Sequence, residues 1–353
     1  MRKQRIPTTP STPPYKNTSL SIVRRVDDLL ARMTLREKAQ QLCCILGAEV
    51  NWYNHTPFIR DGKLDMPVTR RLLGNGIGQI AMALAYLPPV KGARAANAIQ
   101  KFLTTQTRLG IPAIIHEECL HGFKTITATS FPQAIALGAA WDPALTRRVG
   151  AAIGAEVRAR GCNLVLTPTV NITTDPRCGR TEESYGEAVE LVSRTAVAFI
   201  KGLQSNGIGA TAKHFAANFA GDGGRDSHAI YFSERIMREK FFPAFKAAIR
   251  EAKVAALMSA YNAFDGVPCS CNPWLLRTIL RDEWKFDGIT VSDYSAVRHI
   301  SENHFAAPND EQAGRLALEG GRTQNGCALC TGMRPGRTIN RRNCRSSLDR
   351  ARL

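Results

Sequence analysis

The sequence predicts an α/β protein with a (β/α)8 TIM-type barrel that is incomplete at its C-terminal end. Three observations lead to this prediction. Six short apolar runs alternate with longer amphipathic segments, a pattern typical of buried parallel strands joined by helices. Six such units in succession favour a barrel over an open, doubly wound sheet. Polar residues also gather directly after the apolar runs, where a barrel places its active-site groups.

The predicted strands are short and continuously apolar. They cover residues 76–81, 112–115, 164–168, 210–213, 255–259 and 288–292. The first strand is not followed by the Gly-x-Gly-x-x-Gly pattern of a dinucleotide site, so no nucleotide cofactor is expected.

Helix signals lie before and between these runs. A first helix is predicted from apolar residues on one face, namely Ile22, Val26, Leu29 and Met33. Residues 34–37 (Thr-Leu-Arg-Glu) form a capping box that opens a second helix. Asp142 followed by proline begins a helix that stops at Gly161, and Asn272 followed by proline opens another.

The length and composition fit a globular protein with one large domain or two smaller ones. The chain has 353 residues, of which 44% are hydrophobic. We expect residues 1–18 to be disordered, residues 19–321 to form the barrel, and residues 322–353 to form a basic tail. The N-terminal segment lacks the apolar core of a secretory signal, and no run is long enough to span a membrane. A cytoplasmic protein with no membrane partner is therefore expected.

The positive charge is concentrated at the C-terminal end. The formal net charge is +17, and residues 322–353 hold eight arginines against one acidic residue, Asp349. Neither interleaved aromatic residues nor zinc-finger spacing accompanies these arginines, so we expect no nucleic-acid partner.

The ten cysteines do not form the regular pattern of a disulfide framework. Six of them lie within or beside apolar stretches and are expected to be reduced and mostly buried: Cys43, Cys44, Cys119, Cys162, Cys269 and Cys271. Cys327 and Cys330 have the spacing of half a zinc site, but no second pair follows them. We therefore expect no metal and no other cofactor.

Five motifs, in order and with suitable spacing, resemble glycoside hydrolase family 3, and the resemblance covers residues 20–321. They are residues 175–187 (Asp-Pro-Arg-Cys-Gly-Arg-Thr-Glu-Glu-Ser-Tyr-Gly-Glu), 212–215 (Ala-Lys-His-Phe), 258–262 (Met-Ser-Ala-Tyr-Asn), 265–269 (Asp-Gly-Val-Pro-Cys) and 286–294 (Phe-Asp-Gly-Ile-Thr-Val-Ser-Asp-Tyr). Residues 116–122 (His-Glu-Glu-Cys-Leu-His-Gly) and 129–133 (Thr-Ser-Phe-Pro-Gln) are similar to the branch of bacterial β-glucosidases and β-xylosidases.

The resemblance implies a retaining glycosidase that removes terminal β-linked glucose or xylose from a small carbohydrate. Asp293 matches the nucleophile of the family, and a carboxylate at the end of an apolar strand has few structural reasons to be there. The resemblance also implies a set of residues that contact the sugar: Glu118, Arg180, Lys213, His214, Tyr261 and Tyr294. Lys213 and His214 would donate hydrogen bonds to hydroxyls, and Lys213 would favour the charged form of Asp293.

Two departures from the family pattern affect the site. Cys178 stands where the family usually has tryptophan, next to Arg180. A retaining mechanism also needs an acid/base group, which two-domain members take from a sandwich domain after the barrel. Asp226 and His228 are candidate substitutes because they echo the Asp-Ser-His dyad of the β-N-acetylhexosaminidases of the family. Three alternatives follow: a sugar-binding remnant without activity, an N-acetylhexosaminidase, and a basic nucleic-acid binder that depends on the tail.

The family pattern breaks off at Gly321. Members continue there with Gly-Val-Asp and an apolar run, whereas this chain continues with residues rich in arginine and cysteine. We therefore expect residues 322–353 to be translated out of frame or from a degraded gene. A barrel without its last strand has two open edges, so we expect low stability and weak activity.

Overall fold

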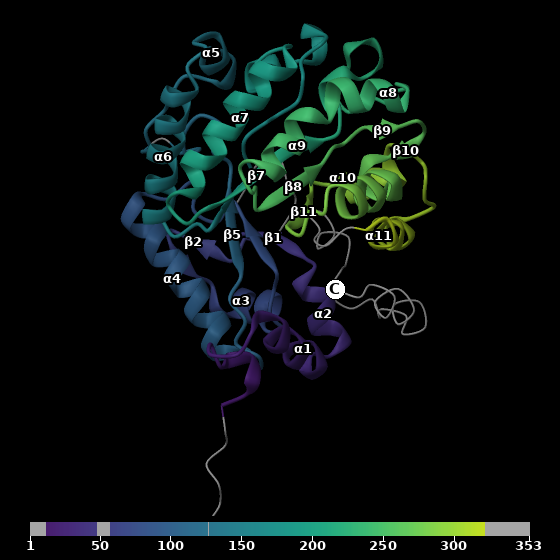
Figure 1. Ribbon diagram of the computed structural model, residues 1–353. Helices are drawn as coiled ribbons and strands as arrows, with labels where there is room; N and C mark the ends of the chain where they lie inside the picture. The colour runs from purple at the N-terminus through teal and green to yellow at the C-terminus, as the bar shows by residue number, and fades with distance from the viewer. Residues whose placement is uncertain (1–11, 48–56, 126, 322–353) are drawn as a thin grey trace, which may run out of the picture.

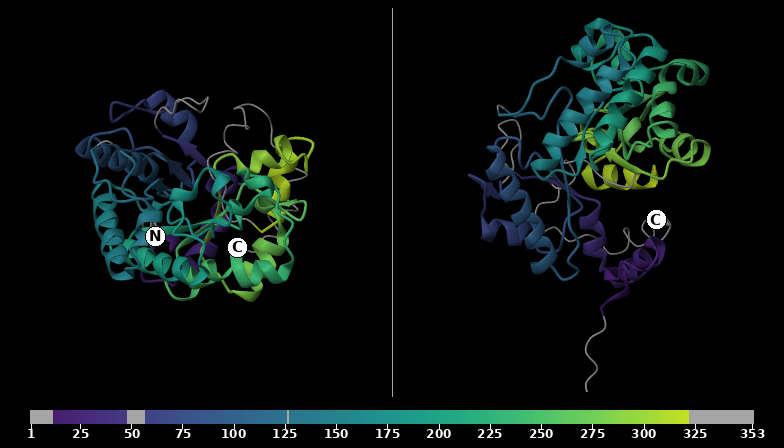
Figure 2. Two further views of the ribbon diagram at one scale, coloured as in Figure 1. Left: turned by 90° about the horizontal axis from the view of Figure 1, so that it is seen from above. Right: turned by 60° about the vertical axis from the view of Figure 1, so that its left-hand side comes forward.

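A curved sheet of seven parallel strands forms the centre of the computed structural model, which describes residues 12–47, 57–125 and 127–321. The strand order is β1-β4-β5-β6-β7-β8-β11, and the helices lie on the outside of the curve (Figure 1). The views in Figure 2 show the sheet partly wrapped around an axis, with helices around it. The predicted fold class, an incomplete (β/α) barrel, is confirmed.

The seven strands are short. They are β1 (Cys44–Leu46), β4 (Gln79–Ala81), β5 (Ile114–Glu117), β6 (Leu164–Val165), β7 (Gly209–Phe215), β8 (Ala256–Ser259) and β11 (Ile289–Ser292). Six of them fall on or against the predicted apolar runs, whereas β1 was not predicted. Two antiparallel pairs lie outside the main sheet: β2 (Ile59–Arg60) with β3 (Lys63–Leu64), and β9 (Ala263–Phe264) with β10 (Val267–Pro268).

The α-helices connect the strands and cover them. They are α1 (Ile22–Arg32), α2 (Leu35–Gln41), α3 (Met66–Leu73), α4 (Pro89–Gln106), α5 (Ala134–Ala139), α6 (Pro143–Ala159), α7 (Val189–Gln204), α8 (Glu234–Ile236), α9 (Pro243–Arg250), α10 (Ala296–Glu302) and α11 (Asp310–Glu319). Two π-helical segments, η6 (Met237–Phe241) and η8 (Trp274–Glu283), continue this layer. Helices α6 and α7 pack closely at Gly202, where a Cβ atom would lie only 2.2 Å from the carbonyl oxygen of Arg147. Glycine is therefore needed at this position.

Short 3-10 helices lie mostly in the loops. They are η1 (Pro14–Lys16), η2 (Pro176–Cys178), η3 (Thr181–Glu183), η4 (Asn218–Ala220), η5 (Asp222–Gly224) and η7 (Cys269–Cys271). The first of them falls within residues 1–18, which were expected to be disordered. There, the hydroxyl of Tyr15 donates a 2.8 Å hydrogen bond to the carbonyl oxygen of Leu109.

The predicted helix starts have the expected caps. The Thr34 side chain accepts from the amide of Glu37, and the Glu37 carboxylate accepts from the amide of Thr34, so the capping box is confirmed. Asp142 caps α6 through the amide of Leu145, and Pro143 occupies the first helical position. Asn272 accepts from the amide of Leu275 at the start of η8.

Helix α1 differs from its prediction in the position of its apolar face. Ile22 is 75% exposed and Val26 is 41% exposed, while Met33 at the end of the helix is buried. The 3.6-residue pattern therefore predicted the helix correctly, but the start of its apolar face is open to solvent.

Apolar side chains pack on both faces of the sheet. Residues on or beside neighbouring strands, including Leu164, Ala256 and Val291, pack together as one cluster. A much larger cluster packs the strands against the surrounding helices. Within the described ranges, β1 and β11 are each hydrogen-bonded to only one neighbouring strand, so the sheet has two open edges.

The cysteine prediction is confirmed for the residues that the structure describes. Seven cysteines are free and buried: Cys43, Cys44, Cys119, Cys162, Cys178, Cys269 and Cys271. Cys327, Cys330 and the basic tail lie outside the described residues. In the described part of the chain, no helix is both long and apolar enough to cross a membrane.

Candidate active site

Several of the predicted site residues come together at the carboxyl ends of the strands. Glu118 directly follows β5, Lys213 and His214 lie in β7, and Asp293 directly follows β11. A cavity of about 500 Å³ is lined by Glu118, Lys213, Arg180 and Tyr294, among others, while His214 and Asp293 lie behind these residues and are not part of its lining. These residues lie up to 176 positions apart in the sequence (118 to 294), and parallel strand order brings them together.

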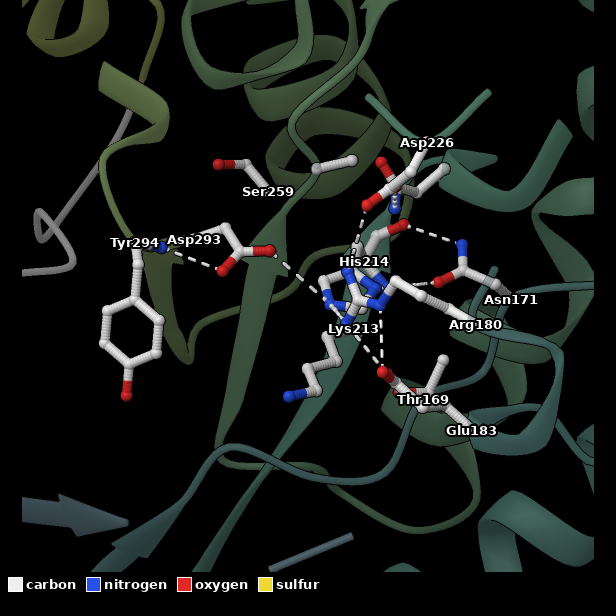
Figure 3. A network of polar contacts seen from close by, with 12 residues as sticks. Thr169, Asn171, Arg180, Glu183, Lys213, His214, Asp226, Ser259, Asp293 and Tyr294 are labelled. Atoms are coloured by element: carbon white, nitrogen blue, oxygen red, sulfur yellow. Dashed lines mark hydrogen bonds and ion pairs between the residues drawn. The ribbon is translucent and has the colours of Figure 1, made fainter. Parts of the chain in front are cut away.

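Asp293 is 5% exposed and lies at one side of a polar network whose middle is occupied by His214 and Arg180 (Figure 3). Its Oδ1 accepts a 2.8 Å hydrogen bond from the amide of Tyr294, and its Oδ2 lies 3.4 Å from Nε2 of His214. Burial raises the pKa of Asp293 to about 6, although Lys213 and Arg180 act in the opposite direction. The expectation that Lys213 favours the charged form is therefore correct in sign, but burial outweighs it.

Lys213 is buried and pairs with Glu118 across the strand ends. Its Nζ lies 2.8 Å from Oε2 of Glu118, and only 4% of the lysine side chain is exposed. A buried ammonium paired with a carboxylate is held in one geometry, with donors and an acceptor side by side at the cavity wall. This arrangement suits the recognition of adjacent hydroxyl groups.

Glu117, the last residue of β5, contacts a different part of the molecule from its neighbour Glu118. It is 1% exposed, and Oε1 accepts a 2.7 Å hydrogen bond from the amide of Leu84. Burial raises the pKa of Glu117 to about 8. Glu117 thus supports the loop after β4, in which Met82 lines the cavity.

Arg180 is held in place by Glu183, a residue that the sequence analysis did not select. Nε and Nη2 of Arg180 donate to the two carboxylate oxygens of Glu183, at 2.9 and 2.7 Å. Nη2 also lies 3.1 Å from Nε2 of His214, and the guanidinium lies over the ring of Phe219. Arg177 instead pairs with Asp175, 2.6 Å from Nη2 to Oδ2, and its side chain is exposed.

His214 is 1% exposed, and both of its ring nitrogens have close neighbours. Nδ1 lies 3.0 Å from Oδ1 of Asn171, and Nε2 faces Arg180 and Asp293. Burial lowers the pKa of His214 well below its usual range, and Arg180 and Lys213 lower it further. The imidazole is therefore neutral at ordinary pH.

The two tyrosines lie in different surroundings. Tyr294 lines the cavity and packs against a cluster formed by Cys44, Leu46, Ala81 and Met82. The ring of Tyr261 lies 5.3 Å from the ring of His299, and its carbonyl oxygen lies 2.7 Å from Nε2 of His304. Tyr261 is thus joined to helix α10 and to the loop that follows it.

Asp226 and His228 differ in how exposed they are and in which residues they contact. Asp226 accepts a 2.9 Å hydrogen bond from Asn218 and lies 3.9 Å from Nη1 of Arg180. The side chain of His228 is exposed to solvent. Asp226 therefore reaches the edge of the site through Arg180, as Figure 3 shows, whereas His228 lies on the surface.

The structure adds Asn171 and Glu183 to the predicted residues. Both hold other site residues through side-chain hydrogen bonds, and short-range patterns in the sequence do not specify such partners. Glu183 lies three residues after Arg180 in a recognised motif, which could have indicated it. Among the described residues, no group of three or more His, Cys, Asp or Glu side chains could hold a metal ion.

Known proteins with similar sequences identify the family of this chain. The sequence profile of the glycosyl hydrolase family 3 N terminal domain matches residues 34–323. The chain belongs to this family. A β-xylosidase from Formosa agariphila is 41% identical over 228 residues, which cover 61% of this chain and 32% of that protein.

Solved structures of the same family are also similar. A β-glucosidase from Erythrobacter marinus has a TM-score of 0.82 and 34% identity, over 96% of this chain and 45% of that one. A β-glucosidase from Listeria innocua in complex with glucose has a TM-score of 0.75 and 30% identity, over 87% of this chain and 42% of that one. The chain thus spans less than half the length of these relatives, which are glycoside hydrolases.

Proposed function

We propose that this chain carries the nucleophile and sugar-binding half of a retaining β-glycosidase that acts on terminal glucosyl or xylosyl residues. One observation carries the proposal: a single buried carboxylate, Asp293, ends a barrel strand among groups suited to sugar hydroxyls. The comparisons support the substrate class, because the similar proteins include β-glucosidases and a β-xylosidase, and one of them binds glucose.

In the proposed reaction, an oxygen of Asp293 attacks the anomeric carbon of the bound sugar. The bond from that carbon to the leaving oxygen breaks as an ester bond to Asp293 forms. Water then cleaves the ester and restores the original configuration. Because the attacking form is the carboxylate and the pKa of Asp293 is about 6, the rate of the first step should rise as the pH increases through 6.

The neighbours of Asp293 would bind and orient the sugar. The Lys213–Glu118 pair offers donors and an acceptor to adjacent hydroxyls, and Arg180 offers the planar donors that Glu183 holds in place. The ring of Tyr294 forms one wall of the cavity against which a pyranose could pack. Such positioning lowers the entropic part of the barrier.

The leaving oxygen also needs a proton, and Asp226 is the candidate within the described residues. It lies at the edge of the site, 3.9 Å from Arg180, and its side chain is 35% exposed. An aryl leaving group of low basicity needs little protonation, so the first step can be tested without this group.

The proposal is tested by trapping the ester with an activated aryl 2-deoxy-2-fluoro-β-glucoside or xyloside. Mass spectrometry should find one added glycosyl group, and peptide mapping should place it on Asp293. The Asp293→Asn variant should remain unlabelled, because an amide oxygen is a poor nucleophile. The matched control, Asp226→Asn, should still be labelled. A label on another residue, or labelling of Asp293→Asn, would disprove the assignment.

A sugar-binding protein without activity is the alternative, and the same experiment separates it. In that case glucose or xylose raises the melting temperature, while no covalent label forms. An N-acetylhexosaminidase would instead turn over an aryl N-acetylglucosaminide faster than the glucoside. Because His228 is exposed rather than paired with Asp226, we favour the glucosidase or xylosidase reaction.

A further inference from the structure

We infer that Asn171 is a positioning residue that fixes which nitrogen of His214 carries the proton, and so keeps Oδ2 of Asp293, the oxygen that faces the ring, free of a hydrogen-bond donor. This inference deepens the proposed function, because it assumes that Asp293 is the nucleophile. It concerns a residue that no motif in the sequence analysis selected.

Asn171 is bound to His214 at three points. Its Oδ1 lies 2.8 Å from the backbone nitrogen of His214 and 3.0 Å from Nδ1 of the ring. Its Nδ2 donates to the backbone carbonyl oxygen of His214 at 3.0 Å. Asn171 is 2% exposed, and the amide of the preceding residue, Val170, donates to the carbonyl oxygen of Lys213 at 2.7 Å. The side chain is therefore held in one orientation.

These contacts settle the orientation of the Asn171 amide. A backbone N–H can only donate, so the atom that faces the amide of His214 has to be the oxygen of Asn171. The nitrogen of Asn171 then faces a backbone carbonyl, which can only accept. Since Oδ1 is an acceptor, Nδ1 of His214 has to carry a hydrogen in order to bond to it.

In the neutral imidazole the other ring nitrogen, Nε2, consequently carries a lone pair and no hydrogen. Nη2 of Arg180, which is always protonated, donates to Nε2 of His214 at 3.1 Å. Oδ2 of Asp293 faces the same nitrogen at 3.4 Å. Nε2 of His214 and Oδ2 of Asp293 are therefore both acceptors and form no hydrogen bond with each other. Within the described part of the chain, Oδ2 of Asp293 has no hydrogen-bond partner.

This arrangement has a chemical consequence for the nucleophile. A hydrogen bond from an imidazolium to the carboxylate would stabilise the charge of Asp293 and make its oxygen a weaker nucleophile. Asn171, a neutral acceptor, does not favour the imidazolium. His214 would then accept a hydrogen bond, from Arg180 or from a sugar hydroxyl, instead of donating one.

The charged surroundings also disfavour a second proton on the ring. Arg180, the residue before η3, and Lys213 in β7 both lower the pKa of His214, and burial lowers it in the same direction. Asp293 at the end of β11 acts in the opposite direction, and so do Glu183 and Asp226 on the far side of Arg180. Replacing Asn171 by aspartate would add a carboxylate in direct contact with Nδ1 and reverse this balance.

The protonation pattern can be read by NMR without turnover, in the full chain labelled with ¹⁵N-histidine. Two-bond nitrogen–proton spectra distinguish a ring protonated on Nδ1, on Nε2 or on both. The His214→Gln variant identifies the signals of His214 by their loss. We expect the Nδ1–H pattern from about pH 5 to 8. An Nε2–H pattern, or an imidazolium at pH 7, would overturn the inference.

The variant Asn171→Asp should convert His214 to the doubly protonated form at pH 7. Labelling by the 2-fluoro glycoside should then slow by on the order of tenfold at pH 7, and its acid limb should move to lower pH. The control is Asn262→Asp, since Asn262 is equally buried and its Nδ2 contacts the carbonyl oxygen of Ala216 at 3.3 Å. The His214 signals of the Asn262→Asp variant should match those of the wild type.

The outcomes of the two proposals can be separated. If no covalent label forms on Asp293 while His214 shows the Nδ1–H pattern, the proposed function fails and the role of Asn171 in setting the protonation pattern stands. If the label forms but Asn171→Asp leaves the His214 signals unchanged, Asn171 has only a structural role. A uniform loss of labelling without a shift in its pH dependence would lead to the same conclusion.

Discussion

At the scale of single residues, Asp293 occupies a position that suits chemistry better than stability. Its folded-state pKa of about 6 lies above the ordinary value of 3.8, because the carboxylate is buried. The folded protein therefore keeps a proton that the unfolded chain has already released between these values. Stability consequently declines as the pH rises from about 3.8 to 6, and the loss is complete above pH 6.

This sign leads to a prediction for Asp293→Asn. The variant should be more stable than the wild type at pH 8, by on the order of 2 kcal/mol, because it has no buried charge to desolvate. The gain should shrink as the pH falls and disappear near pH 4, where the wild-type carboxyl is also neutral. Thermal melts across this pH range measure it. A gain that is independent of pH, or a loss at pH 8, would contradict the prediction.

The residues that carry charge could be selected from the sequence, whereas their supporting partners could not. Asp293 and Glu118 follow apolar strands and Lys213 lies near the end of one, so the alternation of strands and helices predicts that these residues converge. Asn171 lies in an irregular loop after β6, and its three bonds to His214 depend on the path of two backbones. Only the folded chain brings those backbones together.

At the scale of elements, the start of α2 offers a local test. The capping box of Thr34 and Glu37 is extended by Arg108, whose Nη2 and Nε bind the carboxylate of Glu37. Replacing Thr34 by alanine removes the acceptor for one of the free amides of the helix. We expect a loss of about 1 kcal/mol in the free energy of unfolding.

Urea or thermal unfolding of Thr34→Ala against the wild type measures this loss. The control is Thr104→Ala, because the hydroxyl of Thr104 donates to a carbonyl oxygen within α4 and caps no helix start. That variant should stay within about 0.5 kcal/mol of the wild type. Equal effects of the two substitutions would show that the capping box contributes nothing specific.

Strand β1 is an element that could not be predicted from the sequence. Residues Cys44–Leu46 form only three positions of strand directly after a helix, so neither alternation nor a flanking turn marks them. Their assignment depends on pairing with β4, where Cys44 lies opposite Gln79. Helices α2 and α6, by contrast, carry their caps within the local sequence.

At the scale of the whole molecule, the two open edges of the sheet have the largest expected effect on stability and association. Strands β1 and β11 pair on one side only within the described ranges, and unpaired strand edges promote association with other chains. The barrel class could be predicted from the order of the elements. The exposure of Ile22 and Val26 on α1 could not, because a periodic pattern does not reveal what covers a face.

We therefore expect the 353-residue chain to melt in a broad transition below body temperature or to aggregate on heating. The physical reason is the apolar and hydrogen-bonding surface left open at β1, β11 and α1. Circular dichroism and light scattering at several protein concentrations measure this. A variant ending at Gly321 is the control for the charge of the tail. A sharp, cooperative transition above body temperature would contradict the prediction.

Tyr294 connects the two ends of the sheet, since it follows Asp293 after β11 and packs against Cys44 and Leu46 of β1 and Ala81 of β4. Any spreading of β1 away from β11 would pull this ring and the peptide that positions Asp293. A sugar that packs on Tyr294 would resist such spreading, so occupancy of the cavity and curvature of the sheet should be thermodynamically linked. Tight-binding sugar mimics would then also raise the melting temperature of this protein.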